Sequence, residues 1–283
     1  MPARVEPDGA LLALHQKEQQ LAAWFRAKGS AVVAFSGGVD SAFLACVALD
    51  ALGATNVLAI IGRSASFPAE QWQRAREVAR RFGVPAIEVD TDEMGDQRYA
   101  ANPSNRCYFC KSELWSKLVP VARERGLAVV VDGTNADDLL DHRPGRRAAA
   151  EQGVLSPLVE LGFHKTEIRR LSQRRGIPTW SVPSSPCLSS RLPYGLRVTS
   201  ERLRQVEAAE QAVRALGIAG NIRVRHHGDL ARVELDPGVL DDWLAPHKLA
   251  ALGAAVAEGD FARVSLDLAG FRSGSLNVLM GVP

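Results

Sequence analysis

Short apolar runs alternate with amphipathic segments over the first half of the chain. The runs are four or five residues long and hold almost no charge, which is typical of strands buried in a parallel sheet. They lie at residues 31–35, 57–61, 86–89 and 128–131. The amphipathic segments have apolar side chains at helical spacing, and most are followed by glycine. They lie at residues 11–28, 42–52, 69–82 and 112–125. This alternation predicts an α/β fold with a doubly wound parallel sheet.

The pattern changes in the later part of the chain. After one further helix near residues 165–175, residues 178–195 are rich in proline and serine and are interpreted as an active-site loop and linker. Beyond them we expect a helix capped by Thr199 or Ser200, then two alternating strands, a helix and a last strand. The last four elements are expected at residues 222–225, 231–235, 240–257 and 262–268. The sequence therefore predicts a first domain over residues 1–186 and a smaller α+β domain over residues 187–283.

Composition and charge argue against several kinds of partner. The chain has 46% hydrophobic and 23% charged residues, which is ordinary for a globular protein. Its 34 basic and 32 acidic residues give a formal net charge of +2, whereas nucleic-acid-binding domains are usually strongly basic. No apolar run approaches the roughly 20 residues that a membrane span needs, and the first apolar run is too broken for a signal peptide. We therefore expect a cytoplasmic protein with no nucleic-acid and no membrane partner.

The residues after the first predicted strand are suited to binding phosphate. Ser-Gly-Gly-Val-Asp-Ser stands at residues 36–41, between that strand and the next helix. The two glycines let the backbone approach an anion closely, and the loop amides and helix N-terminus supply partial positive charge. The loop lacks the lysine of a Walker A motif and the spacing of the dinucleotide fingerprint. The alternative is an ordinary Gly-Gly turn. The expected nucleotide contacts are Ser36, Gly37, Gly38, Val39, Asp40 and Ser41.

This loop resembles that of the pyrophosphatase-loop (PP-loop) superfamily of adenylate-forming enzymes. Its members include GMP and NAD synthetases, asparagine synthetase and tRNA-thiolating enzymes, which bind ATP, join AMP to a substrate oxygen and release pyrophosphate. The resemblance implies ATP as cosubstrate, a catalytic role for Asp40, and Mg²⁺ held by Asp137, unless Asp137 and its neighbour form only a solvated turn. Lys165 opens another shared segment and is either a phosphate ligand or a solvated helix start. The implied nucleotide contacts outside the loop are Gly62, Ser64, Gly133, Thr134 and Asp137.

The four cysteines fall into two kinds. Cys46 stands among small apolar residues inside a predicted helix and is interpreted as a core residue. Cys107 and Cys110 form a Cys-x-x-Cys pair, and Cys187 lies in a loop rich in proline and serine. Because the cytosol keeps thiols reduced, we expect these three cysteines to serve chemistry rather than disulfides.

The cysteine motifs resemble the LarE family, the sulfur-inserting branch of the superfamily. They are Asn-Arg-Cys-Tyr-Phe-Cys-Lys at residues 105–111 and Pro-Cys-Leu-Ser-Ser-Arg-Leu-Pro-Tyr-Gly at residues 186–195, and the likeness extends to residues 223–232 and 270–275. It implies pyridinium-3,5-biscarboxylic acid mononucleotide as the small-molecule substrate. The implied product is its thiocarboxylate, a precursor of the nickel-pincer nucleotide cofactor. LarE proteins tend to form homo-oligomers, and the second domain is the expected contact surface.

Two sources of the sulfur remain open. In LarE members with a single cysteine matching Cys187, that residue gives up its own sulfur and becomes dehydroalanine. Here Cys107, Cys110 and Cys187 offer three thiolates, which suit a [4Fe–4S] cluster that passes sulfide to the substrate, and we favour this version. The residues also allow a thioredoxin-like redox pair, or zinc held by the three cysteines with His142 or His164.

Arginines of the second domain are candidates for binding the substrate. Arg223 and Arg225 alternate along a predicted strand and so share a face, where two guanidinium groups suit a phosphate monoester. LarE proteins use the matching pair in this way. Arg191 and Arg272 are expected to join them. The alternative is an exposed basic strand.

Two other functions stay open. A different PP-loop enzyme is one, but a tRNA thiolase should have a markedly basic accessory domain, and an amidotransferase-type synthetase has no need of three cysteines in active-site loops. The other is a non-enzymatic carrier of a metal or cluster, which predicts no release of pyrophosphate from ATP.

Overall fold

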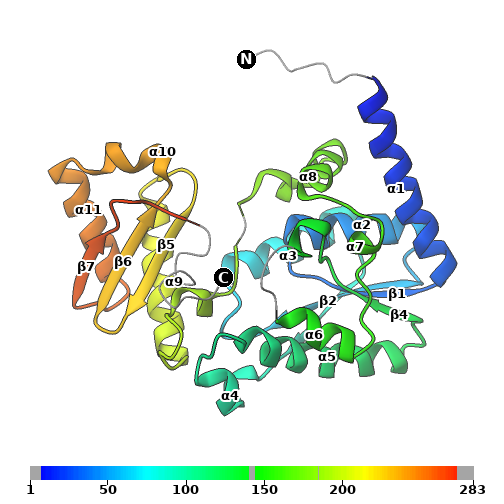
Figure 1. Cartoon of the computed structure of the whole chain (residues 1–283), viewed down its shortest axis with the longest axis horizontal. Coiled ribbons are helices and arrows are strands. Elements are labelled where there is room, and N and C mark those ends of the chain that lie inside the picture. Colours follow the sequence, from blue (N-terminus) through cyan, green and yellow to red (C-terminus); the bar gives the residue numbers. More distant parts are fainter. Residues whose placement is uncertain (1–7, 140–143, 184, 273–283) are drawn as a thin grey trace. The chain divides into compact units, whose positions relative to one another are not determined.

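The computed structural model describes residues 8–139, 144–183 and 185–272, and the chain divides into two compact units (Figure 1). The first unit comprises Met1–Arg63, Ala69–Thr91 and Cys110–Ser184. The second comprises Ser64–Pro68, Asp92–Phe109 and Ser185–Pro283. Two short segments from the first half of the chain thus belong to the second unit. The predicted boundary between residues 186 and 187 stays a prediction.

A four-stranded parallel sheet forms the centre of the first unit. Its strands, in the order β3-β2-β1-β4, are β1 (Ala31–Ala34), β2 (Val57–Arg63), β3 (Ala86–Asp90) and β4 (Val129–Val131). Ala31 of β1 pairs with Val57 on one side and Val129 on the other. The first three residues of β1 are fully buried, as expected of a strand covered on both faces. The predicted α/β fold with a parallel sheet is confirmed.

Helices cover both faces of this sheet. Figure 1 shows α1 and α2 on one side and α5 and α6 on the other. The helices are α1 (Asp8–Lys28), α2 (Val39–Leu52), α3 (Ala69–Phe82), α5 (Arg106–Glu124), α6 (Gly145–Glu151), α7 (Pro157–Glu160) and α8 (Lys165–Arg174). α2 is buried along most of its length, because its sequence is apolar on nearly every side. Among the described residues of both units, no helix is long and apolar enough to cross a membrane.

The strand order brings two loops together beside β1. The chain runs outward from β1 through β2 to β3 and then returns to the opposite side of β1 at β4. In open parallel sheets, ligands bind at the carboxyl ends of the strands where the order reverses in this way. The segments after β1 and β4 meet there, since a Cβ added to Gly133 would lie 2.9 Å from the backbone nitrogen of Ser41.

The second unit has a smaller sheet in the order β5-β6-β7. Its strands are β5 (Ile222–His227), β6 (Leu230–Leu235) and β7 (Arg263–Leu266). β5 and β6 form an antiparallel hairpin, whereas β6 and β7 are parallel. Its helices are α4 (Gln97–Ala100), α9 (Ser200–Ala215), α10 (Pro237–Leu240) and α11 (Pro246–Ala257). At the start of α9, Thr199 Oγ1 accepts the backbone N–H of Arg202 at 3.2 Å, which confirms the predicted cap. The predicted smaller α+β unit is present.

The prediction of one continuous helix over residues 240–257 is wrong. α10 ends at Leu240, a 3₁₀ turn covers Asp241–Trp243, and α11 begins at Pro246. Ala245 is extended, with φ −62° and ψ 137°. Proline disfavours the helical conformation in the residue before it, so Pro246 ends one segment and begins the next.

Candidate functional site

The loop between β1 and α2 leaves the N-terminus of α2 available to a ligand. Gly38 is the N-cap residue of α2, with extended backbone, and no side chain caps this helix. The first N–H groups of a helix have no partner within the helix, so they favour an anion at this position. Gly37 has φ +69°, and a Cβ there would lie 2.8 Å from the backbone of Ala75. The loop thus requires glycine for both its conformation and its close packing.

Two serines stabilise the loop from within. Ser41 is 4% exposed; its Oγ donates to Gly38 O at 3.2 Å and accepts the backbone N–H of Ser36 at the same distance. The two serine hydroxyl oxygens are also 3.2 Å apart. Gln71 Nε2 donates to Ser36 O at 3.0 Å, which ties the loop to α3. These bonds preorganise the loop in the absence of a ligand.

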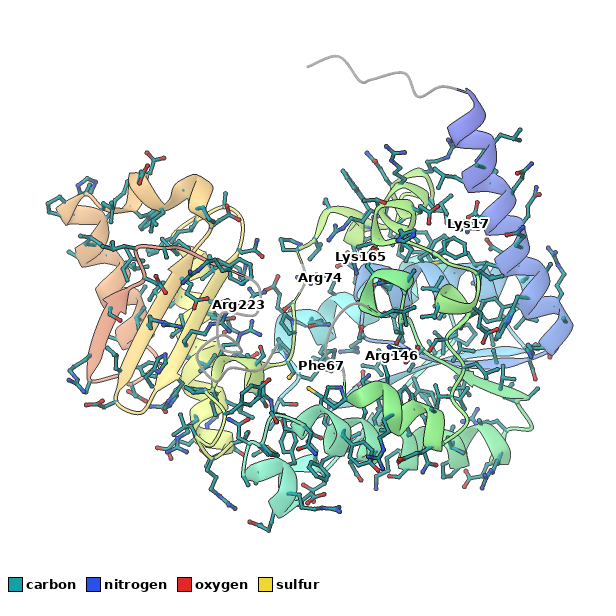
Figure 2. The ribbon with its side chains drawn as sticks, in the orientation of Figure 1. Lys17, Phe67, Arg74, Arg146, Lys165 and Arg223 are labelled. Atoms are coloured by element: carbon teal, nitrogen blue, oxygen red, sulfur yellow. The ribbon has the colours of Figure 1, made fainter. Side chains whose placement is uncertain are left out.

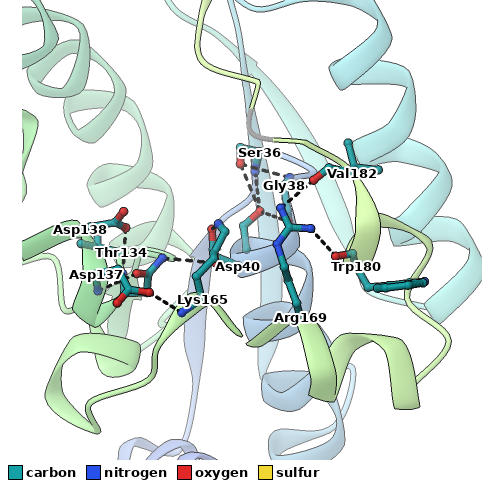
Figure 3. Close-up of polar contacts among 12 residues, drawn as sticks. Ser36, Gly38, Asp40, Thr134, Asp137, Asp138, Lys165, Arg169, Trp180 and Val182 are labelled. Atoms are coloured by element: carbon teal, nitrogen blue, oxygen red, sulfur yellow. Dashed lines mark hydrogen bonds and ion pairs between the residues drawn. The ribbon is translucent and has the colours of Figure 1, made fainter. Parts of the chain in front are cut away.

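Asp40 and Lys165 form an ion pair beside the loop (Figure 3). Lys165 Nζ donates to Asp40 Oδ2, and Asn135 Nδ2 donates to the other carboxylate oxygen at 3.4 Å. Burial raises the pKa of Asp40 above its ordinary value, and the charge of Lys165 opposes this shift. The pair brings an ammonium group to the predicted phosphate loop. The role of Lys165 as a phosphate ligand stays a prediction.

A buried carboxylate orders the segment after β4. Asp132 is 8% exposed and accepts the backbone N–H of Thr134 at 3.1 Å, the hydroxyl of Thr134 at 2.8 Å and that of Ser156 at 2.7 Å. Asn135 is 1% exposed, and its Oδ1 accepts the backbone N–H of Asp137 at 3.0 Å. Sequence reasoning did not identify Asp132 as part of the site, although it directly follows a buried strand. Asn135 lies within the segment at residues 133–137 that resembles a nucleotide-binding segment of the superfamily, but it was not predicted to be a contact.

Asp137 positions the start of α8. Its carboxylate lies 2.7 Å from His164 Nδ1 and accepts the backbone N–H of Lys165 at 2.7 Å. The bond to His164 is the main reason that the pKa of Asp137 is lowered. Through these contacts Asp137 fixes the backbone of Lys165. Its predicted role as a Mg²⁺ ligand stays a prediction.

Two of the predicted nucleotide contacts, Gly62 and Ser64, lie where β2 ends. Gly62 is half-buried, and a Cβ there would be 2.5 Å from a methyl carbon of Leu114, so a larger residue would require the Leu114 side chain to move. Ser64 belongs to the second unit, where its hydroxyl oxygen is 3.0 Å from that of Ser66. Contact of Gly62 and Ser64 with the nucleotide stays a prediction.

In the second unit, Cys187 lies on a tightly held turn. It is half-buried and directly precedes the 3₁₀ turn Leu188–Arg191. Arg191 is 1% exposed and donates to Pro186 O at 2.6 Å and to Cys187 O at 3.1 Å. The same guanidinium pairs with Glu210 at 2.8 and 2.9 Å. The ion pair therefore supports the backbone around Cys187. Contact of Arg191 with the substrate stays a prediction.

Arg223 and Arg225 are both 5% exposed on β5, so the alternative of an exposed basic strand is wrong. Arg225 pairs with Glu234 at 2.8 Å and donates to Ser190 O at 3.0 Å, on the turn that follows Cys187. Arg223, labelled in Figure 2, donates to Ile222 O, and its guanidinium lies 5.0 Å from the ring centre of Phe271.

Electrostatics make Arg223 the more suitable of the two for an anion. Burial, followed by the positive charge of Arg191, lowers the pKa of Arg223 to about 10. A buried cation among other cations is stabilised by a bound anion. Arg272 is exposed and follows Phe271 in the chain, whereas residues 273–275 of the same motif lie outside the described residues.

The cysteines are only partly arranged as a metal site. Cys107 is exposed and Cys110 half-buried, and both lie near the N-terminal end of α5, where residues three apart share a face. Thiolates at this spacing suit two ligands of an iron–sulfur cluster. However, no three Cys, His, Asp or Glu side chains are gathered to hold a metal ion anywhere in the described ranges.

The remaining cysteine and the two histidines can be placed as well. Cys46 is 3% exposed, which confirms it as a core residue, and burial raises the pKa of its thiol to about 12. Of the histidines considered for zinc, His164 contacts Asp137, and His142 lies outside the described residues.

A parallel sheet whose first strand leads through Ser-Gly-Gly-Val-Asp-Ser into a helix N-terminus defines a PP-loop ATP-binding enzyme. In agreement, the sequence model of the NAD synthase family matches residues 18–115. The NH(3)-dependent NAD(+) synthetase of Methanococcoides burtonii is 30% identical over 165 residues, covering 55% of this chain and 60% of that protein.

Two longer matches define the family. Uncharacterized protein slr1717 of Synechocystis is 44% identical over 264 residues, which cover 93% of this chain and 98% of that protein. Pyridinium-3,5-bisthiocarboxylic acid mononucleotide synthase of Lactiplantibacillus plantarum is 37% identical over 269 residues, which cover 93% of this chain and 95% of that protein. The chain belongs to the LarE family of ATP-dependent sulfurtransferases.

Proposed function

We propose that this protein adenylates a carboxylate of pyridinium-3,5-biscarboxylic acid mononucleotide and replaces the adenylate with sulfur. The product is a thiocarboxylate for nickel-pincer nucleotide cofactor biosynthesis. The observation that carries the proposal is that one unit combines Cys187 with two buried arginines, and that Arg225 donates to the turn directly after Cys187. A phosphate on Arg223 and Arg225 would anchor a nucleotide-like substrate near a sulfur nucleophile.

The first step joins the substrate carboxylate to AMP. A carboxylate oxygen attacks the α-phosphorus of ATP, and the bond between that phosphorus and pyrophosphate breaks. The loop amides at residues 36–41 and the two serine hydroxyls stabilise the charge on the phosphates. Lys165 leaves Asp40 for the phosphates in this proposal, which frees the Asp40 carboxylate. Mg²⁺ held by Asp137 would supply further positive charge.

The second step replaces AMP with sulfur. We favour a [4Fe–4S] cluster on Cys107, Cys110 and Cys187, which would supply sulfide when bound and spare the protein sulfur. In the sacrificial alternative, the Cys187 thiolate attacks the activated carbonyl carbon and AMP leaves, which gives a thioester. Removal of the Cys187 α-proton then breaks its Cβ–Sγ bond. The thiocarboxylate departs and dehydroalanine remains.

One experiment tests the proposed function and separates its two versions. The protein is purified without oxygen and assayed for iron and sulfide. It is then incubated for one turnover with Mg²⁺, ATP and the mononucleotide, and the mass of the intact chain is measured by mass spectrometry. Iron with an unchanged chain mass supports the cluster. Loss of one hydrogen sulfide from Cys187 supports the sacrificial version. Absence of both pyrophosphate and thiocarboxylate contradicts the proposal and favours a tRNA thiolase, another synthetase or a carrier.

A matched pair of variants assigns the sulfur step to Cys187. Cys187→Ala should release pyrophosphate but form no thiocarboxylate, because adenylation needs only the first unit's loop and the bound substrate. Cys46→Ala, which removes the buried core thiol, is the control and should form product normally. Normal product from Cys187→Ala would remove Cys187 from the mechanism. The proposed homo-oligomer, with the second unit as contact surface, is tested on the same samples by light scattering.

A further inference from the structure

Asn102 has a backbone conformation that few side chains adopt. It has φ 56°, in the left-handed region, where asparagine is among the few non-glycine residues that occur. It is 0% exposed and follows α4 in the second unit. A buried polar side chain requires hydrogen-bond partners, so the contacts of Asn102 show what this position does.

The side chain of Asn102 holds the chain that follows Cys187. Its Nδ2 donates to Pro193 O at 2.7 Å and to Leu196 O at 2.9 Å. Its backbone carbonyl accepts the N–H of Gly195 at 2.9 Å. Three hydrogen bonds from one residue therefore fix residues 193–196. We call residues 186–196, which include Cys187 and this held end, the cysteine strap.

The other side of Asn102 holds the start of α5. Its Oδ1 accepts a hydrogen bond from Arg106 at 2.7 Å. Arg106 is 6% exposed, directly precedes Cys107, and places its guanidinium 4.7 Å from the ring centre of Tyr194 in the strap. The amide of Asn102 thus uses both its donor and its acceptor to join the strap to the residue before Cys107.

Further contacts support the strap near Cys187 itself. Tyr99, just before Asn102, has its hydroxyl oxygen 2.6 Å from that of Ser189, and both residues are buried. Leu188 N donates to Ser66 O at 2.8 Å. These contacts come from the two short segments that the second unit takes from the first half of the chain. They hold the residues beside Cys187, whereas Asn102 holds the end of the strap.

We propose that Asn102 is a positioning residue for sulfur transfer, which holds the cysteine strap in place relative to the first turn of α5. The inference rests on the proposed function of Cys187. The side chain of Asn102 makes its hydrogen bonds within the second unit, whereas the loop at residues 36–41 belongs to the first. Loss of Asn102 should therefore leave adenylation intact and misplace the sulfur. A displacement of about 1 Å can slow a reaction about 100-fold.

Asn102→Asp is the sharpest test. Aspartate has nearly the same shape, tolerates the same backbone conformation and still accepts from Arg106. It replaces the NH₂ group with an oxygen that faces the carbonyl oxygens of Pro193 and Leu196, so the strap loses two of the three hydrogen bonds that hold its end. Val256→Ala is the control, because it removes part of a fully buried side chain on α11, away from the strap. The measured quantity is the ratio of thiocarboxylate to pyrophosphate, which a loss of folded protein does not change.

We expect this ratio to fall about 100-fold in Asn102→Asp, because the adenylate is hydrolysed before sulfur reaches it. In Val256→Ala the ratio should stay at the wild-type value. An unchanged ratio in Asn102→Asp overturns the inference while the proposed function stands.

Alkylation of Cys187 by iodoacetamide, followed by peptide mass spectrometry, gives a test that needs no activity. Release of the strap should speed alkylation of the half-buried Cys187 about tenfold, with buried Cys46 as the internal reference. Equal alkylation rates in the variant and wild type also overturn the inference, even if the wild type forms no thiocarboxylate and the proposed function fails.

Discussion

Replacement of Gly37 by alanine tests whether the phosphate loop depends on its close packing. Gly37 has φ +69°, and an added Cβ would lie 2.8 Å from Cα, Cβ and the backbone nitrogen of Ala75, which is fully buried. Gly83 is a matched control in the same unit, since it has φ +67° and nothing within 4 Å of its added Cβ. Both substitutions impose the left-handed conformation on alanine. Only Gly37→Ala adds a collision with backbone.

The expected costs follow from these two differences. A left-handed alanine costs about 1–2 kcal/mol, which is the whole effect expected for Gly83→Ala. Overpacking against a rigid neighbour costs a further ~1–3 kcal/mol, so Gly37→Ala should lower the free energy of unfolding by about 2–5 kcal/mol. The loop can avoid the collision only by moving its amides. We expect pyrophosphate release by the folded Gly37→Ala variant to fall about 100-fold.

Urea unfolding and pyrophosphate release measure the two effects separately. The reasoning predicts that Gly37→Ala is less stable than Gly83→Ala and much less active per folded molecule. If both variants have the same stability and the same activity, the packing of Gly37 against Ala75 has no role in forming the site.

Three further predictions concern charges. Removal of the buried guanidinium in Arg223→Met should raise the free energy of unfolding by up to about 3 kcal/mol, since its lowered pKa reports an unfavourable charge. Added inorganic phosphate should stabilise this variant less than the wild type in thermal melts, and equal stabilisation of both would contradict this. Lys165→Met should slow pyrophosphate release at least about 100-fold. Because Lys165 lowers the pKa of Asp40, the variant should also lose activity at a higher pH than the wild type as the solution is acidified. An unchanged acid limb of the pH profile would refute the pairing of Lys165 with Asp40. His226 is 2% exposed, and its pKa is lowered from 6.5 to about 4, mainly by burial. Between pH 6.5 and pH 4, His226 is therefore protonated in the unfolded chain but neutral in the folded one. The free energy of unfolding should fall by about 3 kcal/mol as the pH drops across this range, and His226→Gln should reduce this pH dependence in urea titrations.

The sequence predicts the sheet well, because its signals are local. Apolar runs such as residues 31–35 can be satisfied only by burial on both faces, and glycines at the helix ends mark where each segment stops. The single helix over residues 240–257 is wrong for a local reason too, since the effect of Pro246 on Ala245 was available in the sequence. Element type therefore follows from patterns within about ten residues.

The supporting residues of the site are much harder to predict. Asp132 and Asn102 belong to no predicted motif, and their importance comes from hydrogen bonds to residues distant in sequence. Asn102 meets Pro193 across 91 residues, a contact that exists only after Asp92–Phe109 has joined the second unit. Periodicity and composition contain no information about such pairings.

Transfer of oxygen from substrate to AMP tests the central claim most directly. The substrate carboxylates are labelled with ¹⁸O, the protein is given Mg²⁺ and unlabelled ATP, and the released AMP is analysed by mass spectrometry. Attack of the carboxylate on the α-phosphorus predicts AMP that carries one ¹⁸O atom, formed together with pyrophosphate. AMP without label, or label in inorganic phosphate, would show that the loop at residues 36–41 does not direct adenylation of the carboxylate.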